Sequence, residues 1–223
     1  ASLFQQGYFT IQDEASQLIG LLVDPKEGER ILDCACGPGG KLTHLFELSN
    51  GKAVLTGVEK NANQMEKAKE TWTRLGHGDI TWVESDLLEY RPDKRFDKVL
   101  LDAPCSGLGV LRRHPEGKWQ KRESLVGTMV QLQRQLLTHA LEHLVAPGGE
   151  LVYSVCSFEL DECEDHVAWI REKYGDRIEL LSPVPRLPDY FKRYVTRDNL
   201  LQVYAGNQDD MDGFGAFIVR LKS

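Results

Sequence analysis

The chain has 223 residues, of which 41% are hydrophobic and 27% charged, and its formal net charge is −7. The length fits one domain, and this composition excludes a disordered or collagen-like chain. The longest apolar runs, such as Leu18–Val23, are too short to span a bilayer, and no signal peptide is visible. We therefore expect a single domain over 1–223, with a helical lead-in over 1–28, in the cytoplasm and away from membranes.

The cysteine content points to a reducing compartment. An odd number of cysteines at irregular spacing makes a poor disulfide framework, and no second pair of ligands lies at zinc spacing. We expect free thiols that are available for chemistry, and no metal site. The five cysteines are Cys34, Cys36, Cys105, Cys156 and Cys163.

The acidic balance, with 27 Lys and Arg against 34 Asp and Glu, bears on possible partners. Nucleic-acid binding proteins are usually basic, because neutralisation of phosphates supplies much of their affinity. Any contact with RNA must therefore rest on a local basic cluster or on a segment outside this chain.

Strands and helices are predicted to alternate along the chain, which is typical of an α/β fold with a mainly parallel sheet. Short apolar and β-branched runs indicate the strands, and helical spacing of apolar residues indicates the helices. Pro147-Gly148-Gly149 is expected to end the longest helix. In chain order we predict a strand at Arg30–Asp33, a helix at Lys41–Leu48, a strand at Ala53–Glu59, a helix at Asn61–Leu75, strands at Asp79–Glu84 and Phe96–Leu101, a helix at Ser124–Val145, a strand at Glu150–Val155, a helix at Asp161–Tyr174, and closing strands at Ile178–Leu181 and Gly213–Leu221.

Unusual residues gather where four of these strands end. In open α/β sheets, ligands bind beyond the carboxyl ends of the strands. The segment Cys36–Lys41 follows the first strand, Glu59 ends the second, Asp102–Ser106 follows the fourth, and Cys156 follows the fifth. We therefore expect one site along this edge of the sheet.

The turn after the first strand is predicted to hold a cofactor. In Pro38-Gly39-Gly40-Lys41, glycines allow a close approach of the backbone to a ligand, and the following helix offers free N–H groups. The spacing matches neither a dinucleotide fingerprint nor a Walker loop. Glu59 is placed to bind ribose hydroxyls and Asp86 to bind an adenine amino group, which favours S-adenosylmethionine. The alternative is a glycine-rich turn that only joins a strand to a helix.

Two Cys-Ser pairs follow adjacent predicted strands, in Asp102-Ala103-Pro104-Cys105-Ser106 and Tyr153-Ser154-Val155-Cys156-Ser157. A single free cysteine is more often an inert buried residue. Two such pairs at neighbouring strand ends, one of them beside Asp-x-Pro, favour chemistry at a shared pocket.

These motifs resemble those of the RNA (cytosine-5) methyltransferases, the Sun/Nop2 family. The resemblance covers nearly the whole chain, and Gly109–Pro115 with Lys118-Trp119 is similar to the small-subunit rRNA methyltransferase B branch of that family. It is carried by Gln12–Ser16, Leu32–Lys41, Asp102–Gly109, Tyr153–Ser157 and Asp212–Phe217.

The resemblance implies a Rossmann-like class I methyltransferase fold, with helices on both faces of a mainly parallel sheet. It also implies S-adenosylmethionine-dependent methylation of carbon 5 of a cytosine in 16S rRNA. Cys156 would add to carbon 6 of the base, Asp102 would bind the ring at N3, and Cys105 would assist release of the product. The base would have to leave any stacked duplex.

The resemblance further implies a set of residues around the cofactor. They are Ala35, Cys36, Gly37, Pro38, Gly39, Gly40, Lys41, Glu59, Asp86 and Asp102. The chain departs from the family pattern at several positions, none of which removes a reacting group. The departures are Ala35-Cys36-Gly37 where Cys-Ala-Ala is usual, Glu59 where Asp is commoner, Val155 in place of Thr, Cys163 in place of Asn, and Gly215 in place of an aromatic residue.

The densest basic cluster directly follows Asp102–Gly109 and is predicted to contact RNA, because Arg and Lys hold phosphates and an aromatic ring stacks an exposed base. The alternative is a solvated loop face. A second, sparser basic set is equally consistent with an ordinary solvent-exposed surface. It consists of Arg186, Lys192, Arg193 and Arg197. The cluster consists of Arg112, Arg113, His114, Lys118 and Trp119, together with Lys121 and Arg122.

Relatives in the family usually carry an N-terminal helical RNA-binding region that this chain lacks, so we expect weak RNA affinity from these residues alone. The expected partner is small-subunit rRNA, and the expected state is a monomer. Three alternatives stay open: the same chemistry on tRNA or large-subunit rRNA, a non-catalytic RNA-binding or assembly module, and a redox protein that uses Cys105 and Cys156 as a dithiol.

Overall fold

The computed structural model describes residues 2–120, 123–206 and 209–223, so Lys121 and Arg122 of the predicted basic cluster lie outside the described residues. Within them the chain forms an eight-stranded sheet in the order β3-β2-β1-β4-β5-β8-β6, with β7 also paired to β8. The strands from β3 to β5 are parallel, and β8 runs antiparallel to its neighbours. The strands are β1 (Arg30–Asp33), β2 (Val54–Glu59), β3 (Thr81–Glu84), β4 (Phe96–Asp102), β5 (Val145–Val155), β6 (Ile178–Leu181), β7 (Leu201–Val203) and β8 (Phe214–Leu221).

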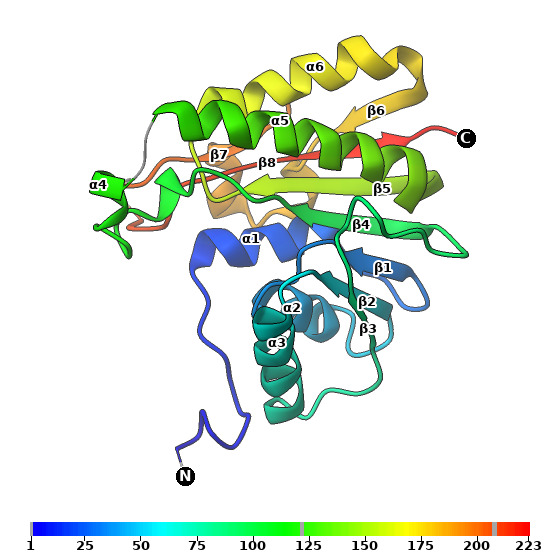
Figure 1. Cartoon of the computed structure of the whole chain (residues 1–223), viewed down its shortest axis with the longest axis vertical. Coiled ribbons are helices and arrows are strands. Elements are labelled where there is room, and N and C mark those ends of the chain that lie inside the picture. The colour runs from blue at the N-terminus through cyan, green and yellow to red at the C-terminus, as the bar shows by residue number, and fades with distance from the viewer. Residues whose placement is uncertain (1, 121–122, 207–208) are drawn as a thin grey trace.

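Helices cover both faces of this sheet, as predicted (Figure 1). Successive strand residues point to opposite faces. Val99 and Leu101 therefore pack with α5 and α6, whereas Leu100 between them packs with α1, α2 and α3. The helices are α1 (Glu14–Val23), α2 (Gly40–Leu48), α3 (Ala62–Arg74), α4 (Gly117–Gln120), α5 (Glu123–His139) and α6 (Glu164–Tyr174).

Side-chain caps fix where two of the helices begin. Asn61 accepts hydrogen bonds from the backbone N–H groups of Asn63 and Gln64, so α3 opens at the residue that the sequence indicates. Asp13 caps α1 through the N–H of Ala15 at 3.0 Å. In the predicted helical lead-in, only Glu14–Val23 is α-helical, and 2–13 forms turns and extended chain.

Three predicted boundaries are wrong. The predicted helix Ser124–Val145 ends as a π-helical turn over Ala140–Leu144, and β5 begins at Val145, where it pairs with Phe96. The Pro-Gly-Gly sequence lies in an irregularity of β5, because the register jumps from Phe96–Val145 to Lys98–Glu150. The helix predicted over Asp161–Tyr174 is broken at Cys163, between a 3₁₀ turn and α6.

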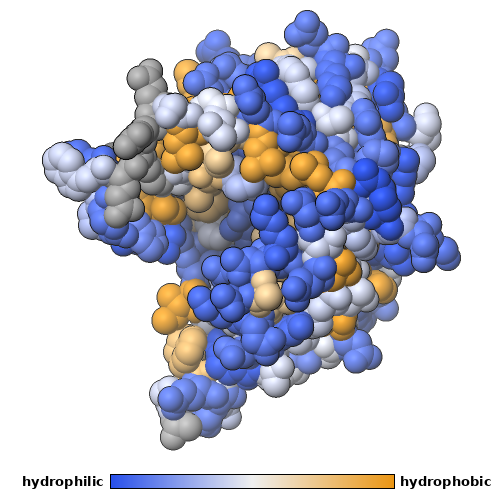
Figure 2. All heavy atoms as spheres, in the orientation of Figure 1, coloured by the Kyte–Doolittle hydropathy of each residue, from blue (hydrophilic) through white to orange (hydrophobic). Residues whose placement is uncertain are grey.

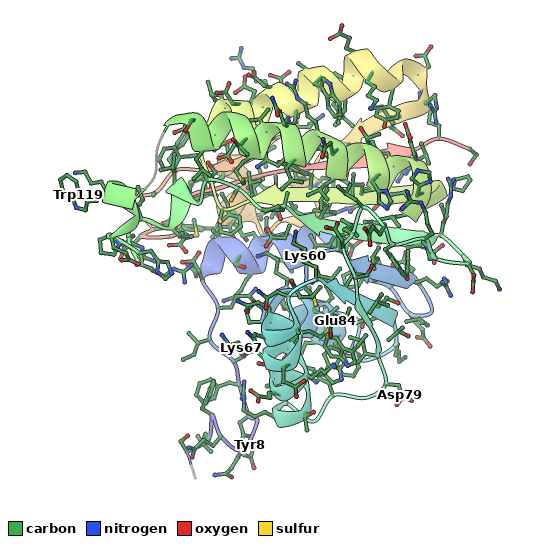
Figure 3. All side chains as sticks on the ribbon, viewed as in Figure 1. Tyr8, Lys60, Lys67, Asp79, Glu84 and Trp119 are labelled. Atoms are coloured by element: carbon green, nitrogen blue, oxygen red, sulfur yellow. The ribbon has the colours of Figure 1, made fainter. Side chains whose placement is uncertain are left out.

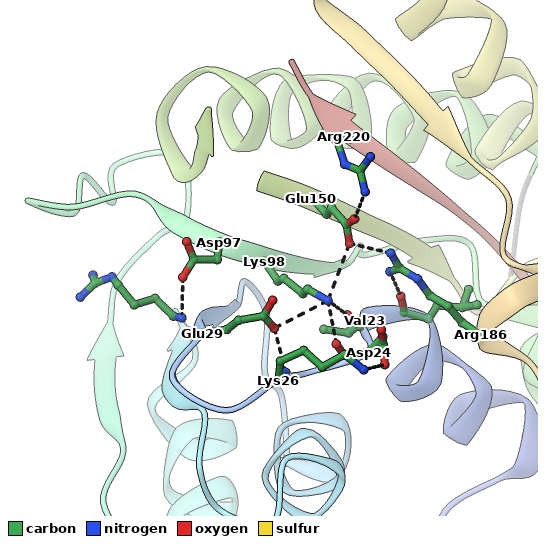
Figure 4. A network of polar contacts seen from close by, with 11 residues as sticks. Val23, Asp24, Lys26, Glu29, Asp97, Lys98, Glu150, Arg186 and Arg220 are labelled. Atoms are coloured by element: carbon green, nitrogen blue, oxygen red, sulfur yellow. Dashed lines mark hydrogen bonds and ion pairs between the residues drawn. The ribbon is translucent and has the colours of Figure 1, made fainter. Parts of the chain in front are cut away.

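A buried lysine ties α1 to the end of the sheet opposite the predicted site (Figure 4). The ammonium of Lys98 donates to the carbonyl oxygens of Val23 at 2.8 Å and Asp24 at 2.7 Å. It also lies 3.6 Å from Glu29 and 3.8 Å from Glu150. Because the amine has several acceptors, its charge is tolerated in a largely buried position. Glu150 is in turn paired with Arg186 and Arg220.

Candidate active site at the carboxyl edge of the sheet

Two adjoining cavities open where β1, β2, β4 and β5 end. The larger has a volume of about 580 Å³ and the smaller about 280 Å³, and both are lined by Ala35 and Asp102. In Figure 2 the surface is hollowed on this side, where hydrophobic residues beside α5 face hydrophilic residues below them. The four strand ends that were predicted to form the site therefore lie around one connected pair of cavities.

The glycine-rich loop is shaped by two neighbours. Gly39 has a φ of +91°, and a Cβ on it would lie 3.1 Å from the Cα of Ala68 in α3, so glycine suits this turn. The N–H of Gly37 donates to Oε2 of Glu59 at 3.0 Å, and the N–H of Asn61 donates to Oε1 at 2.8 Å. Glu59 is thus held with its carboxylate beside the loop and along the smaller cavity.

The smaller cavity combines apolar walls with carboxylates. Leu87 and Leu136 line it together with Glu59 and Asp86. Asp86 accepts a hydrogen bond from the N–H of Leu88 at 3.0 Å, and Lys60 (labelled in Figure 3) lies 3.7 Å from it. Apolar walls suit a purine ring, and the carboxylates suit a ribose diol and an exocyclic amine. These residues fit the adenosine part of S-adenosylmethionine.

Cys156, after β5, lines the larger cavity, and Cys105, after β4, lies against it. The Sγ atoms of Cys105 and Cys156 lie 3.2 Å apart. The hydrogen bond from Cys105, supported by the charge of Lys41, lowers the pKa of Cys156, although burial and Asp102 oppose this. The same hydrogen bond, burial and the charge of Glu162 raise the pKa of Cys105. Cys156 is therefore the more readily ionised thiol of the pair, and Cys105 is placed to donate a hydrogen bond to it.

Two hydrogen bonds hold the Asp102 side chain at the boundary of the two cavities. Its Oδ2 accepts from the Lys41 ammonium at 2.6 Å, and its Oδ1 accepts from the Ser154 hydroxyl at 2.7 Å. Burial acts to lower the pKa of Lys41, but the adjacent Asp102 outweighs it and the pKa is raised. A charged Lys41 thus stabilises negative charge both on Asp102 and on Cys156.

The predicted RNA-contact residues fall into two groups. Arg112 and Arg113 line the larger cavity and are paired with Asp212, and Arg112 also lies 3.3 Å from Asp13. Asp212 is fully buried, so these arginines hold the loop before β8 against the cavity. His114, Lys118 and Trp119 lie at the surface, and Figure 3 shows Trp119 projecting away from the body of the protein.

The sequence reasoning missed Asp33, the last residue of β1. Its side chain lines the larger cavity and is 1% exposed, and neither carboxylate oxygen has a side-chain hydrogen-bond partner among the described residues. Burial, and then the charge of Asp102, raise its pKa to about 7. The sequence feature that could have pointed to Asp33 is an acidic residue at the end of the predicted strand Arg-Ile-Leu-Asp.

Two departures from the family pattern are neighbours in the structure. A Cβ on Gly215 would lie 2.7 Å from the Sγ of Cys163, so the larger residue usual at 215 would collide with this cysteine. Val155 and Cys36 are both buried in the core. Cys36 also lines the larger cavity, whereas Val155, Cys163 and Gly215 line neither cavity.

Likeness to solved structures defines the class. A Thermotoga maritima S-adenosylmethionine-dependent O-methyltransferase matches with a TM-score of 0.58 at 16% identity, over 96% of this chain and 67% of its own. That likeness concerns the fold alone. The crystal structure of NSun6 from Pyrococcus horikoshii, solved with the S-adenosylmethionine analogue SFG, matches with a TM-score of 0.86 at 28% identity, over 100% of this chain and 56% of its own. The fold is that of class I S-adenosylmethionine-dependent methyltransferases.

The sequence then gives the family. The chain belongs to the 16S rRNA methyltransferase RsmB/F family, whose model matches residues 20–222. It is 34% identical to the probable ribosomal RNA small subunit methyltransferase B of Bacillus subtilis over 228 residues, which cover 98% of this chain and 49% of that protein. The chain thus spans about half the length of this relative. The predicted family and fold are confirmed, and this relative carries the predicted enzyme class in its name.

Proposed function

We propose that the chain transfers a methyl group to carbon 5 of a cytosine in small-subunit rRNA, through a covalent bond between Cys156 and carbon 6 of the base. The observation that carries the proposal is the Cys105–Cys156 thiol pair at 3.2 Å, with Cys156 lining the larger cavity together with Asp102, the residue at the junction of the two cavities. A cofactor in the smaller cavity and a base in the larger one would meet at this junction. Bound S-adenosylmethionine supplies the methyl group as an electrophile on its sulfonium.

The cofactor contacts of this proposal follow from the cavity linings. Glu59 would accept hydrogen bonds from the ribose diol and Asp86 from the adenine amino group. The loop from Ala35 to Lys41 would lie against the remainder of the cofactor, because most of its residues line the larger cavity next to Asp102. The orphaned carboxylate of Asp33 favours a cationic group nearby.

The residues of this chain account for the chemistry at the base. Carbon 5 of cytosine is a weak nucleophile. Attack of the Cys156 thiolate on carbon 6 forms a carbon–sulfur bond and moves electron density to carbon 5, which then takes the methyl group. A proton shared between Asp102 and N3 of the ring would neutralise the negative charge that the attack places on the ring, and would thus stabilise the adduct. Loss of the proton on carbon 5 to solvent water then breaks the carbon–sulfur bond and expels the Cys156 thiolate, which the Cys105 thiol beside it would stabilise by donating a hydrogen bond.

RNA would approach from the side of the larger cavity. The target base has to leave its stack to reach Cys156, as base-modifying enzymes generally require. His114, Lys118 and Trp119 lie at the surface after the Cys105 loop, and the Lys118 ammonium lies 5.5 Å from the centroid of the Trp119 ring. We assign phosphate contact and base stacking to these three residues, and Arg112 and Arg113 to the wall near the flipped base.

The choice of substrate follows from similarity to relatives. The B. subtilis relative is described as a probable ribosomal RNA small subunit methyltransferase. The runner-up is the same chemistry on tRNA or large-subunit rRNA. A non-catalytic RNA-binding module is less favoured because it needs neither thiol, and a dithiol redox protein is less favoured because it needs no adenosine cavity.

We further propose that the enzyme acts in the cytoplasm as a monomer and without a metal. Its five cysteines are free thiols, as a reducing compartment requires. Among the described residues, no group of three or more His, Cys, Asp or Glu side chains is arranged to hold a metal ion. None of the described helices combines the length and apolar character needed to cross a membrane.

Radiolabelled S-adenosylmethionine tests the function. The chain is incubated separately with unmodified small-subunit rRNA, large-subunit rRNA and tRNA, and the labelled nucleoside is identified. We expect 5-methylcytidine in small-subunit rRNA only, and no label with Cys156→Ala, which leaves the smaller cavity intact. Label in another RNA would favour the runner-up. Cofactor binding with no label in any RNA would favour the binding module.

A further inference from the structure

A carboxylate that faces neither cavity lies between the two cysteine loops. Glu162, in the 3₁₀ turn before α6, is fully buried. Its Oε1 accepts from the backbone N–H of Ser106 at 2.7 Å, and its Oε2 accepts from the Ser106 hydroxyl at 2.5 Å. Ser106 directly follows Cys105. Both oxygens of the carboxylate therefore hold the loop that carries this thiol.

A second buried residue, Gln133 of α5, completes the arrangement. Its amide nitrogen donates to Oε1 of Glu162 at 3.1 Å and to the carbonyl of Pro104 at 2.9 Å. Its oxygen lies 2.9 Å from Nε2 of His166. Burial lowers the pKa of His166 to about 4, so the ring is neutral and its N–H donates to Gln133. Gln133 is thereby fixed with its amide nitrogen toward Glu162.

The network also reaches the loop of the other thiol. The hydroxyl of Ser106 lies 3.3 Å from that of Ser157, which directly follows Cys156. Tyr153, in the strand that leads to Cys156, donates its hydroxyl to the backbone carbonyl of Glu162 at 2.8 Å. One buried acid thus connects the segments that carry both cysteines.

The fold alone does not require a charge here. A buried ionised carboxylate is costly unless hydrogen-bond donors surround it, and Glu162 has three of them. Its negative charge also opposes ionisation of Cys105, whose pKa is raised, so that thiol stays the proton donor to Cys156. A neutral side chain would keep neither the donor set nor this charge.

We propose that Glu162 is a positioning residue for methyl transfer, which holds the Cys105 loop so that this thiol stays against Cys156 when the methylated base is released. The inference rests on the proposed function. Glu162 touches neither substrate nor cofactor in this account, since it lines neither cavity. It acts through Ser106 and Cys105.

Glu162→Gln is the sharpest variant, because it keeps the shape of the side chain and places an amide N–H₂ group against existing donors. Displacement of the Cys105 loop is expected to slow product release, and misplacement on the scale of an ångström costs roughly 100-fold in turnover. We expect the variant to accumulate an RNA–protein adduct that survives denaturation, although Cys105 itself is intact. Affinity for S-adenosylmethionine should stay unchanged.

The control is Glu164→Gln, an exposed acid two residues further along, which is expected to turn over normally without trapped adduct. Ser106→Ala removes one of the three hydrogen bonds and should trap a smaller amount. It also supplies the test if Glu162→Gln does not fold. A purely structural role would lower the thermal midpoint and the turnover of these variants without trapping adduct.

Cys105→Ala separates the two ways in which the experiment can fail. If Cys105→Ala traps an adduct, and Glu162→Gln binds cofactor normally but traps none, the positioning role is wrong and the proposed function stands. If Cys105→Ala, with cofactor bound, also traps no adduct on small-subunit rRNA, the covalent mechanism fails and the role of Glu162 fails with it.

Discussion

The Sγ atoms of Cys105 and Cys156 lie 3.2 Å apart, although 51 positions separate the two residues in the chain. They meet because β4 and β5 are parallel neighbours, with Asp102 paired to Ser154 in the ladder, so the loops after both strands leave the same edge of the sheet. The carbonyl of Cys156 also accepts from the N–H of Gly109 at 3.0 Å. A Cβ on Gly109 would lie 2.0 Å from the carbonyl oxygen of Gly213, so only glycine fits this close approach.

The activity is expected to rise with pH as Cys156 ionises. Its pKa is lowered from the ordinary value of 9.0, first by the hydrogen bond from Cys105, so the midpoint of kcat/KM should lie below 9.0. Lys41→Met removes a positive charge that favours the thiolate and should move this midpoint upward. Ultraviolet absorbance of the thiolate, measured against Cys156→Ser, checks the assignment without substrate. An unchanged midpoint in Lys41→Met would contradict it, and Lys67→Met on exposed α3 is the control.

Asp33 is expected to make the fold less stable as pH rises. Its pKa is 3.8 in the unfolded chain and about 7 in the folded protein, so the folded state holds the extra proton between these values. The contribution of Asp33 to the free energy of unfolding is fully present below pH 3.8 and is lost as pH rises through about 7. Asp33→Asn should therefore gain stability relative to the parent chain across that window, as measured by denaturant unfolding.

The matched control is Asp79→Asn, an exposed acid (labelled in Figure 3) whose replacement should give a difference that does not vary with pH. If the difference in the free energy of unfolding between Asp33→Asn and the parent chain also stayed constant with pH, the Asp33 carboxylate would already be ionised near neutral pH.

Lys98 is expected to matter for stability and not for chemistry, since it lies near the start of β4, whereas Cys105 follows the end of that strand. Its network is drawn in Figure 4. Lys98→Met leaves the Glu150 carboxylate and two backbone carbonyls without their shared donor. Glu150 keeps its pairs with Arg186 and Arg220, and each buried carbonyl left without a donor typically costs about 1–3 kcal/mol of the free energy of unfolding. Turnover per folded molecule should stay unchanged. Lys94→Met, at an exposed position on the loop before β4, should alter neither quantity.

Trp119 is expected to contribute to RNA affinity by stacking on a base. Its side chain is 84% exposed and packs near Lys118, so Trp119→Ala should cost the fold little. Loss of one base–aromatic stack weakens binding by about 1–3 kcal/mol. Tyr8→Ala is the control, because Tyr8 is 73% exposed and lies at another end of the molecule (Figure 3). Equal affinities of the two variants for small-subunit rRNA, measured at the same salt, would argue for a plain surface role of Trp119.

Much of the fold could be predicted from the sequence because each central strand is a short buried run between turns. β7 was missed because it has three residues and forms only by pairing with β8. The start of β5 was misplaced because the apolar spacing of α5 continues into it, and only pairing with Phe96 shows where the strand begins.

Local motifs also predicted that the cysteines and the glycine-rich loop lie along one edge of the sheet, since these residues follow strand ends. Contacts between distant segments could not be read in this way. Arg113 was interpreted as an RNA contact, yet it pairs with Asp212, which is 99 positions away. Glu162 and Gln133 look like ordinary helix residues in the sequence, and their role becomes visible only when α5 and the turn before α6 pack on the thiol loops.

In the proposed mechanism, Cys156 bonds to the target base and Cys105 is needed for its release. The most direct measurement is mass spectrometry of the conjugate that Cys105→Ala forms with small-subunit rRNA and S-adenosylmethionine. We predict a peptide containing Cys156 joined to a methylated cytidine, and no conjugate in the double variant that also carries Cys156→Ala. A conjugate through another residue, or continued turnover without any conjugate, would contradict the mechanism.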